Sequence, residues 1–333
     1  MNHDDQTPGW GGLSVIPQGR LLPMQKGRTS MTKPLTIAAC APASYGFVAR
    51  EHEDATVRMI AGHERDPVAI HAHVARFLDH HERLLRRAGE AGAQLAVLPE
   101  DLLRLGGLIR EHRNDRFCRE AVADAYARIV ERLGAQCRQF RMCVVAGTAT
   151  ARDGAFFNTA VMLDANGAVI AAYDKTHIPQ PEEGLYQPGA TLPVFDTPLG
   201  RIGLLICWDI VFPEPYARLA RQGAELIVQS TFGHNDEASD LTARCRARDW
   251  SVPLVVSMWG GPSGIIDAEG NYAARTGTEP DSLAVATLDL AAPRQWLWMN
   301  DVRAEKARLR RPQLYDPENT TERNRHESSD SKN

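Results

Sequence analysis

Cys207 has the sequence context of a catalytic nucleophile. It ends the apolar run Ile202–Ile206, which predicts a buried strand, and Phe212-Pro213-Glu214 after it predicts the first turn of a helix. A thiol between a strand and a helix lies at a sheet edge near a helix N-terminus, whose field favours the thiolate, the form that attacks carbon. The alternative is a buried structural cysteine, the common fate of a free thiol.

Two further predicted strands end at reactive side chains. Apolar Gln94–Leu98 leads to Pro99 and Glu100, and Val169–Asp174 leads to Lys175. One such charge is more often a solvated loop residue, but a glutamate, a lysine and a cysteine that each end a strand, in this order, are much less likely to occur together by chance. Glu100 would be the general base, Lys175 would stabilise the thiolate and the oxyanion, and Cys207 would be the nucleophile.

These segments resemble the nitrilase superfamily of carbon–nitrogen hydrolases. The resemblance rests on Pro99-Glu100, on Tyr173–His177 and on Cys207–Glu214, and it extends from roughly Thr36 to Tyr315. It implies an α/β protein with mixed sheets in a four-layer α-β-β-α sandwich, assembled into homodimers or larger homo-oligomers. It also implies catalytic roles for Glu100, Lys175 and Cys207.

The resemblance implies two substrate-positioning groups as well. A second glutamate should position the substrate and contact the lysine; Gly184 and Tyr186 favour Glu183 for this role, with Glu182 as its rival. The backbone N–H of Trp208, next to the nucleophile, is the expected second donor to the oxyanion.

The implied activity is hydrolysis of a non-peptide C–N bond in a small amide or N-carbamoyl compound, through a cysteine thioester, with release of ammonia or an amine. Asp209 after Cys207-Trp208 is more similar to amidases and N-carbamoyl-amine hydrolases than to nitrile-cleaving members. Nitrile hydrolysis, acyl transfer to an amine and a non-catalytic binding or regulatory role remain alternatives. Arg246–Ser251 departs from the family pattern, so the resemblance does not identify the substrate.

The composition of the chain limits the kinds of partner and cofactor that we expect. The chain has 333 residues, 43% of them hydrophobic, and a net charge of −4, which argues against nucleic acid and anionic membranes. Its six cysteines show no Cys-x-x-Cys pair and no secretory signal precedes them, which favours reduced thiols in the cytoplasm. We expect no cofactor and no metal, because His71, His73, His80 and His81 are predicted to lie on a solvated helix face.

The chain is predicted to hold one enzyme domain over residues 34–318. Residues 1–33 are expected to be a flexible extension, with Met31 as an alternative start, and residues 319–333 a disordered tail. Helices are predicted from Asp66 to about Gly89 and over Asp115–Phe140, and Asn166-Gly167 predicts a hairpin turn.

Overall fold

The computed structural model describes residues 33–43, 65–233, 237–277, 279–292, 298 and 301–315. The described residues belong to one compact unit, Thr32–Asn333. The predicted flexible extension, except for Lys33, and the predicted C-terminal tail lie outside the described residues.

Two mixed sheets form the centre of this unit, each with six strands among the described residues. The first sheet has the order β12-β1-β2-β3-β4-β5 and the second β11-β10-β9-β8-β7-β6. The strands of the first sheet are β1 Pro34–Ala41, β2 Leu95–Val97, β3 Cys143–Arg152, β4 Ala155–Leu163, β5 Val169–Asp174 and β12 Ser282–Asp289. Those of the second are β6 Val194–Thr197, β7 Gly200–Ile206, β8 Leu226–Thr231, β9 Leu254–Met258, β10 Gly264–Ile266 and β11 Tyr272–Arg275.

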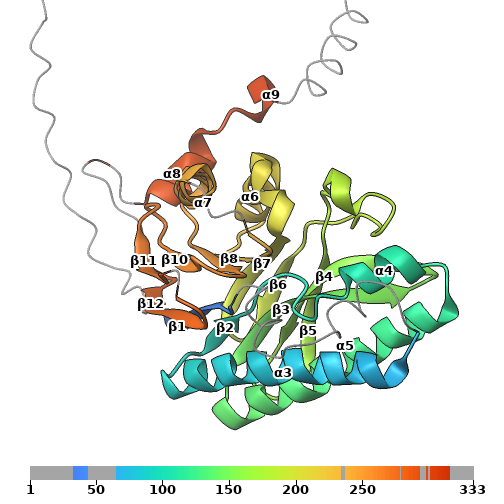
Figure 1. The fold of residues 1–333 in the computed structure, drawn as a ribbon. Coiled ribbons are helices and arrows are strands. Elements are labelled where there is room, and N and C mark those ends of the chain that lie inside the picture. The colour runs from blue at the N-terminus through green and yellow to red at the C-terminus, as the bar shows by residue number, and fades with distance from the viewer. Residues whose placement is uncertain are drawn as a thin grey trace, which may run out of the picture. The chain divides into compact units, whose positions relative to one another are not determined.

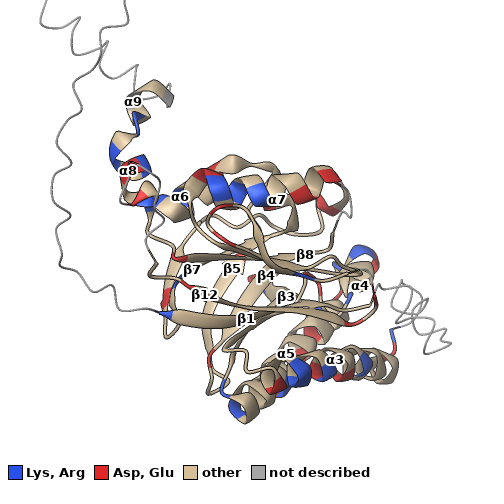
Figure 2. Ribbon diagram, turned by 90° about the vertical axis from the view of Figure 1, so that its left-hand side faces the viewer, with Lys and Arg blue, Asp and Glu red and all other residues tan. Residues whose placement is uncertain are grey.

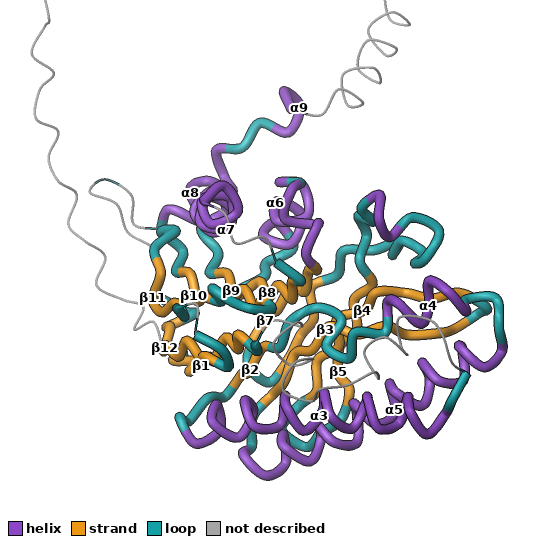
Figure 3. Tube along the Cα trace, viewed as in Figure 1, coloured by secondary structure: helices purple, strands orange, loops and turns teal. Residues whose placement is uncertain are grey.

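Helices cover the outer face of each sheet (Figures 1 and 3). The long helices α3 (Pro67–Glu90) and α5 (Arg116–Phe140) cover the first sheet, and α6 (Pro213–Arg221) and α7 (Glu237–Trp250) cover the second. The view in Figure 2 shows the four layers in turn, with most of the ribbon coloured for charged residues on the helices. The predicted four-layer α-β-β-α sandwich is therefore confirmed. The other α-helices among the described residues are α4 Gly106–His112, α8 Val302–Leu309 and α9 Pro312–Tyr315.

The predicted helix starts are confirmed by their caps. The side chain of Asp66 accepts a hydrogen bond from Val68 N (2.9 Å), and Pro67 occupies the first helical position, where its missing N–H costs nothing. Asp115 lies at the N-cap position of α5. The hairpin of β4 and β5 turns at Asp164–Ala168, where Asp164 accepts from Asn166 N and Ala168 N.

Serine hydroxyls join the two sheets near the strand ends. Ser230 Oγ on β8 donates to Leu98 O after β2 (2.8 Å), and Ser257 Oγ on β9 donates to Cys40 O on β1 (2.7 Å). Each bond satisfies a buried carbonyl group and fixes one sheet against the other. The end of β2, and hence Glu100, is thereby held close to the end of β7, where Cys207 lies.

The prediction of a solvated histidine face on α3 is wrong for three of its four residues. His73, His80 and His81 are buried, and only His71 is exposed at the surface. His73 and His81 share the inward stripe of α3 with Phe77 at a spacing of four residues, so the helical period places all three against the protein interior. Burial lowers the pKa of His73 to about 4 and that of His81 to about 3.

No helix in the described part of the chain is both long and apolar enough to cross a membrane.

The buried histidines predict acid sensitivity of the fold. Between about pH 6.5 and pH 4 the unfolded chain binds a proton at His73 that the folded chain excludes, so the free energy of unfolding decreases as the pH falls. His73→Gln keeps a side-chain N–H donor but does not titrate. Urea unfolding near pH 7.5 and near pH 5 should show that the wild-type protein loses roughly 2 kcal/mol more than this variant.

His71→Gln, at a surface histidine of the same helix, is the control and should lose as much stability as the wild-type protein. Equal losses in the wild-type protein and in His73→Gln would contradict a neutral buried imidazole at position 73.

Candidate active site

The structure brings the three predicted catalytic residues together. Lys175 Nζ, at the end of β5, donates to Glu100 Oε1, just after β2, at 2.9 Å. Cys207 follows β7 directly, and the charges of Glu100 and Lys175 both act on its thiol. Three strands from two sheets therefore deliver one group each to a common point, as the sequence predicts.

Glu100 is fixed on all sides. Its Oε1 also accepts from Asn158 Nδ2 on β4 (2.7 Å), and its Oε2 accepts from Phe232 N after β8 (2.8 Å). The indole Nε1 of Trp259 donates to the backbone carbonyl of Glu100 (2.7 Å). Gly147 on β3 leaves room for this backbone, because a Cβ there would lie 2.6 Å from Glu100 Cα. The carboxylate is thus pre-positioned before any substrate binds.

Two buried histidines hold the loop that follows Glu100. His81 Nε2 bonds to Leu102 O (2.9 Å), and His73 Nε2 bonds to Leu103 O (2.8 Å). A carbonyl oxygen only accepts, so both rings carry the proton on Nε2. Asp101 in this loop has a φ of 47°, a left-handed conformation unfavourable for a side chain, and the histidine bonds help to hold it. The sequence signal for these two histidines is their spacing of four residues from Phe77, which places them on the buried side of α3. The predicted solvated face does not take this spacing into account.

The glutamate that contacts the lysine is Glu182. Lys175 Nζ donates to both of its carboxylate oxygens, at 3.0 and 2.9 Å. Glu183 is exposed, and the prediction that it contacts the lysine is wrong. The short 3₁₀ helix Gln180–Glu182 turns the side chain of residue 182 inward and that of residue 183 outward. Because both residues are glutamates, the sequence alone does not show which of them points towards the lysine.

Cys207 lies in a strained turn at the end of β7. Its φ is 40°, in the left-handed region that side chains rarely adopt. Residues Cys207–Val211 form a 3₁₀ helix, η3, and α6 begins only at Pro213. The predicted helix N-terminus at the thiol is therefore corrected, since the turn of η3 separates Cys207 from α6. Strain of this kind, on the order of 1–3 kcal/mol, persists where surrounding contacts enforce it and is common at functional sites.

Asp209 enforces the turn. Its buried carboxylate accepts from Ile206 N (2.9 Å), from Tyr173 Oη (2.7 Å) and from the Nδ1–H of His177 (2.7 Å). It therefore ties η3 to the end of β5, which carries Lys175. Asp209 and His177 thus brace the turn that carries Cys207.

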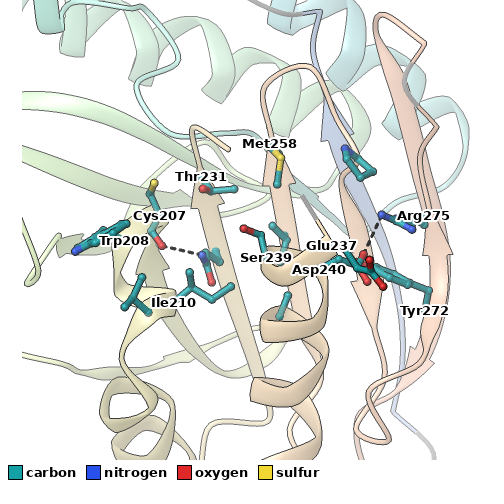
Figure 4. Close-up of a pocket in the computed structure, with 15 residues that line it drawn as sticks. Cys207, Trp208, Ile210, Thr231, Glu237, Ser239, Asp240, Met258, Tyr272 and Arg275 are labelled. Atoms are coloured by element: carbon teal, nitrogen blue, oxygen red, sulfur yellow. Dashed lines mark hydrogen bonds and ion pairs between the residues drawn. The ribbon is translucent and has the colours of Figure 1, made fainter. Parts of the chain in front are cut away.

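Two further side chains hold the backbone of η3. Gln229 Nε2 donates to Cys207 O (3.2 Å), as Figure 4 shows, and Arg246 on α7 donates to Ile210 O and Val211 O (both 3.1 Å).

The electrostatics keep the thiol protonated in the free site. Burial raises the pKa of Cys207 to about 12, and the negative charge of Glu100 acts in the same direction. Lys175, the Thr231 hydroxyl and the Phe232 N–H oppose the rise. The prediction that this environment favours the thiolate is therefore wrong for the free site: two carboxylates surround one ammonium, and a thiolate would add a further negative charge.

The same charges set the protonation of the lysine and of the second glutamate. Burial disfavours the charged form of Lys175, but the carboxylates of Glu100 and Glu182 outweigh it and raise the pKa of the lysine above its ordinary value. Burial and the charge of Glu100 raise the pKa of Glu182. Lys175 is consequently a permanent cation, suited to stabilising negative charge on a substrate oxygen.

Two cavities reach this cluster. One, of about 570 Å³, is lined by Cys207, Trp208 and Thr231 (Figure 4). The other, of about 430 Å³, is lined by Glu100, Glu182 and Phe232. Thr231 and Phe232, consecutive residues at the end of β8, line one cavity each. Trp208, predicted as a substrate-positioning residue, lines the same cavity as its neighbour Cys207. Among the described residues no group of histidine, cysteine and acidic side chains could hold a metal ion.

The family model for carbon-nitrogen hydrolases matches residues 68–297, well over half of the chain. The chain belongs to the carbon–nitrogen hydrolase family. The predicted resemblance to the nitrilase superfamily is confirmed, including its similarity to the amidase-like members.

Three relatives of known name share about 30% sequence identity with this chain. A citrullinase of Francisella tularensis is 30% identical over 197 residues (50% of this chain, 66% of the relative). An N-carbamoylputrescine amidase of Solanum tuberosum is 29% identical over 155 residues (45% and 51%), and a deaminated glutathione amidase of Mus musculus is 32% identical over 157 residues (40% and 48%). The chain therefore matches between about half and two thirds of the length of these three relatives.

Solved structures share the fold. An amidase from Nesterenkonia sp. AN1, solved in complex with acrylamide, superposes with a TM-score of 0.63 at 22% identity, covering 87% of this chain and 98% of the amidase. A carbon-nitrogen hydrolase from Helicobacter pylori G27 gives a TM-score of 0.62 at 19% identity, covering 86% and 95%.

The adjacent glutamates provide a matched pair of variants. Glu182→Gln removes one of the two charges that balance buried Lys175, and we expect kcat/KM for any turned-over substrate to fall by about 10²-fold or more. Glu183→Gln changes an exposed residue and should alter kcat/KM by less than about threefold. The reverse order of effects in steady-state assays would restore Glu183 as the glutamate of the site.

His81 should act on catalysis through Glu100. His81→Leu fills the space but leaves Leu102 O unpaired, which should destabilise the fold by about 1–3 kcal/mol and lower kcat about tenfold with little change in KM. His81→Gln places an N–H close to the lost Nε2 and should recover most of kcat. If the two variants have equal kcat, the hydrogen bond does not position Glu100 and His81 only fills space.

Proposed function

We propose that this protein hydrolyses a non-peptide C–N bond of a small amide or N-carbamoyl compound through a thioester on Cys207. The observation that carries the proposal is the buried cluster of Glu100, Lys175 and Glu182 beside a cysteine held in a strained turn at a cavity. A structural cysteine needs neither an enforced left-handed φ nor a permanent cation and a fixed carboxylate next to it.

In the first half-reaction the Cys207 thiol attacks the carbonyl carbon as Glu100 accepts its proton, and an Sγ–C bond forms. The carbonyl electron pair moves to oxygen, where Lys175 Nζ and the backbone N–H of Trp208 stabilise the negative charge. Lys175 has three N–H donors and makes contacts with three carboxylate oxygens in the free site, so the oxyanion replaces one of the contacts with Glu182.

Collapse of the tetrahedral intermediate breaks the C–N bond. Glu100 returns its proton to the departing nitrogen, and ammonia or an amine leaves a thioester on Cys207. Glu100 then accepts a proton from water, which attacks the thioester and releases the acid or carbamate together with the thiol. The high thiol pKa suits this sequence, because the thiol loses its proton only as it attacks, and one base serves both half-reactions.

Amide or carbamoyl substrates are supported by the relatives, which include an N-carbamoylputrescine amidase, a citrullinase and a deaminated glutathione amidase. Nitrile hydrolysis and acyl transfer to an amine use the same groups. A panel of linear amides, alkyl ureas and nitriles, assayed for ammonia with and without hydroxylamine as acceptor, separates the three activities. Ammonia from amides or ureas without hydroxylamine is the expected result; turnover of nitriles alone, or only with an acceptor, would replace hydrolysis by the corresponding alternative.

Cys207→Ala should abolish turnover, with a loss of several orders of magnitude, because no other group can form the acyl intermediate. Glu100→Gln keeps the shape but cannot carry a proton, so both half-reactions should slow by roughly 10²–10⁴-fold. Intact-mass spectrometry of quenched single turnovers should detect the acyl group on wild-type Cys207, and Cys245→Ala, at a partly exposed cysteine of α7, is the matched control that retains turnover. More than about a tenth of wild-type activity in Cys207→Ala would exclude Cys207 as the nucleophile.

A further inference from the structure

The cavity at Cys207 extends well beyond the space that an amide group requires. From Cys207 and Trp208 it runs along the outer side of the second sheet, beneath the first turns of α7, to Tyr272 and Arg275 on β11 (Figure 4). A volume of about 570 Å³ is within the range of sites that enclose a whole small molecule. The cavity therefore has room for a chain as well as for a reacting group.

The wall between the two ends of this cavity is largely apolar, although Gln229, Thr231 and Ser239 also line the cavity. Ile210 and Val211 of η3 line it, together with Ala243 of α7 and with Val256 and Met258 of β9. These side chains offer no hydrogen bond, so a polar or charged group placed there would lose its hydration without compensation. The wall fits a run of methylene groups leading away from Cys207.

The far end of the cavity carries charge. Asp240 Oδ1 accepts from Tyr272 Oη (2.7 Å) and pairs with Arg275 Nη2 (2.9 Å), so the guanidinium charge is already balanced. Glu237, one turn earlier on α7, also lines the cavity and has no ion pair among the described residues. Among the described residues that line this end, two carboxylates and one guanidinium give a net charge of −1.

We propose that this end of the cavity binds an ammonium group, so that the substrate is an ω-ammonium amide or an ω-ammonium alkyl urea. The inference rests on the proposed function, because it places the reacting carbonyl at Cys207 and the cation about one alkyl chain away. Glu237 attracts the ammonium group, and Asp240, whose Oδ2 receives neither Tyr272 nor Arg275, is the second acceptor.

A carboxylate-terminated substrate fits less well. Arg275 is the cation that lines the cavity, and Asp240 already neutralises it. A carboxylate would therefore meet Glu237 without an unpaired guanidinium to offset the repulsion. A methyl-terminated chain would leave Glu237 without a partner and would gain nothing from this end of the site.

The test compares substrates that differ only at the far end. Linear amides and alkyl ureas with about three to five methylene groups are assayed for ammonia release with an ammonium, a methyl or a carboxylate terminus. We expect kcat/KM to be about tenfold or more higher for the ammonium series than for the methyl series at the best chain length, and lowest for the carboxylate series. A carboxylate or methyl preference would overturn the proposed cation site.

Variants connect the preference to the residues. Glu237→Gln should reduce the ammonium-to-methyl ratio of kcat/KM about fivefold or more, and Asp240→Asn should raise kcat/KM for the carboxylate series by leaving Arg275 unpaired. Glu214→Gln is the matched control, because Glu214 is also an exposed acid in the first turn of a helix next to η3 but does not line the cavity. Its ratio should equal that of the wild-type protein.

The outcomes separate this inference from the function on which it rests. Turnover of the methyl series with an unchanged ratio in Glu237→Gln would leave the hydrolase intact and overturn the cation site; Glu237 would then only complement the dipole of α7. Absence of ammonia release and of any acyl adduct on Cys207 across all three series would instead contradict the proposed function.

Discussion

The buried charge of Lys175 is the constraint on which the site depends. An ammonium group that is wholly buried costs several kcal/mol of lost hydration, on the order of the stability of a domain, and must be offset by close anions and hydrogen bonds. Glu100 and Glu182 supply three carboxylate oxygens within 3.0 Å of Nζ. Each of the three charges is balanced by the others. Moving one side chain would leave a buried charge without its partner, so the three side chains keep a single arrangement.

The surrounding fold holds Glu100, Lys175 and Glu182 close to the thiol of Cys207, which follows a strand of the second sheet. Serine bonds from β8 and β9 fix the two sheets against each other, and Asp209 ties the turn at Cys207 to the end of β5. Trp259 and the neutral rings of His73 and His81 hold the backbone around Glu100. Most of these supporting groups donate to backbone carbonyls, so they fix positions without adding charge to a cluster that already carries an excess of negative charge.

That excess explains why the thiol is protonated in the free site. Because the pKa of Cys207 is raised to about 12, its thiol does not ionise in the free site. The proposed mechanism therefore requires Glu100 within reach when the carbonyl arrives. The strained turn places Cys207 directly after β7, where this residue lines the cavity. Reactivity is thus produced by placement more than by a permanently activated thiolate.

The sequence by itself determined the fold class, the long helices and the three residues proposed for catalysis. Asp66-Pro67 and the apolar stripes fix the helices locally, and Glu100, Lys175 and Cys207 each end an apolar strand, so local pattern was sufficient. Only the tertiary structure could decide that Glu182, and not Glu183, contacts the lysine. In a 3₁₀ turn, a shift of one residue changes the direction in which a side chain points. It also decided that His73 and His81 are buried, because their partners are carbonyls some 20 to 30 residues away. The pairing of β12 with β1 and the thiol pKa depend likewise on long-range contacts, which a linear pattern does not contain.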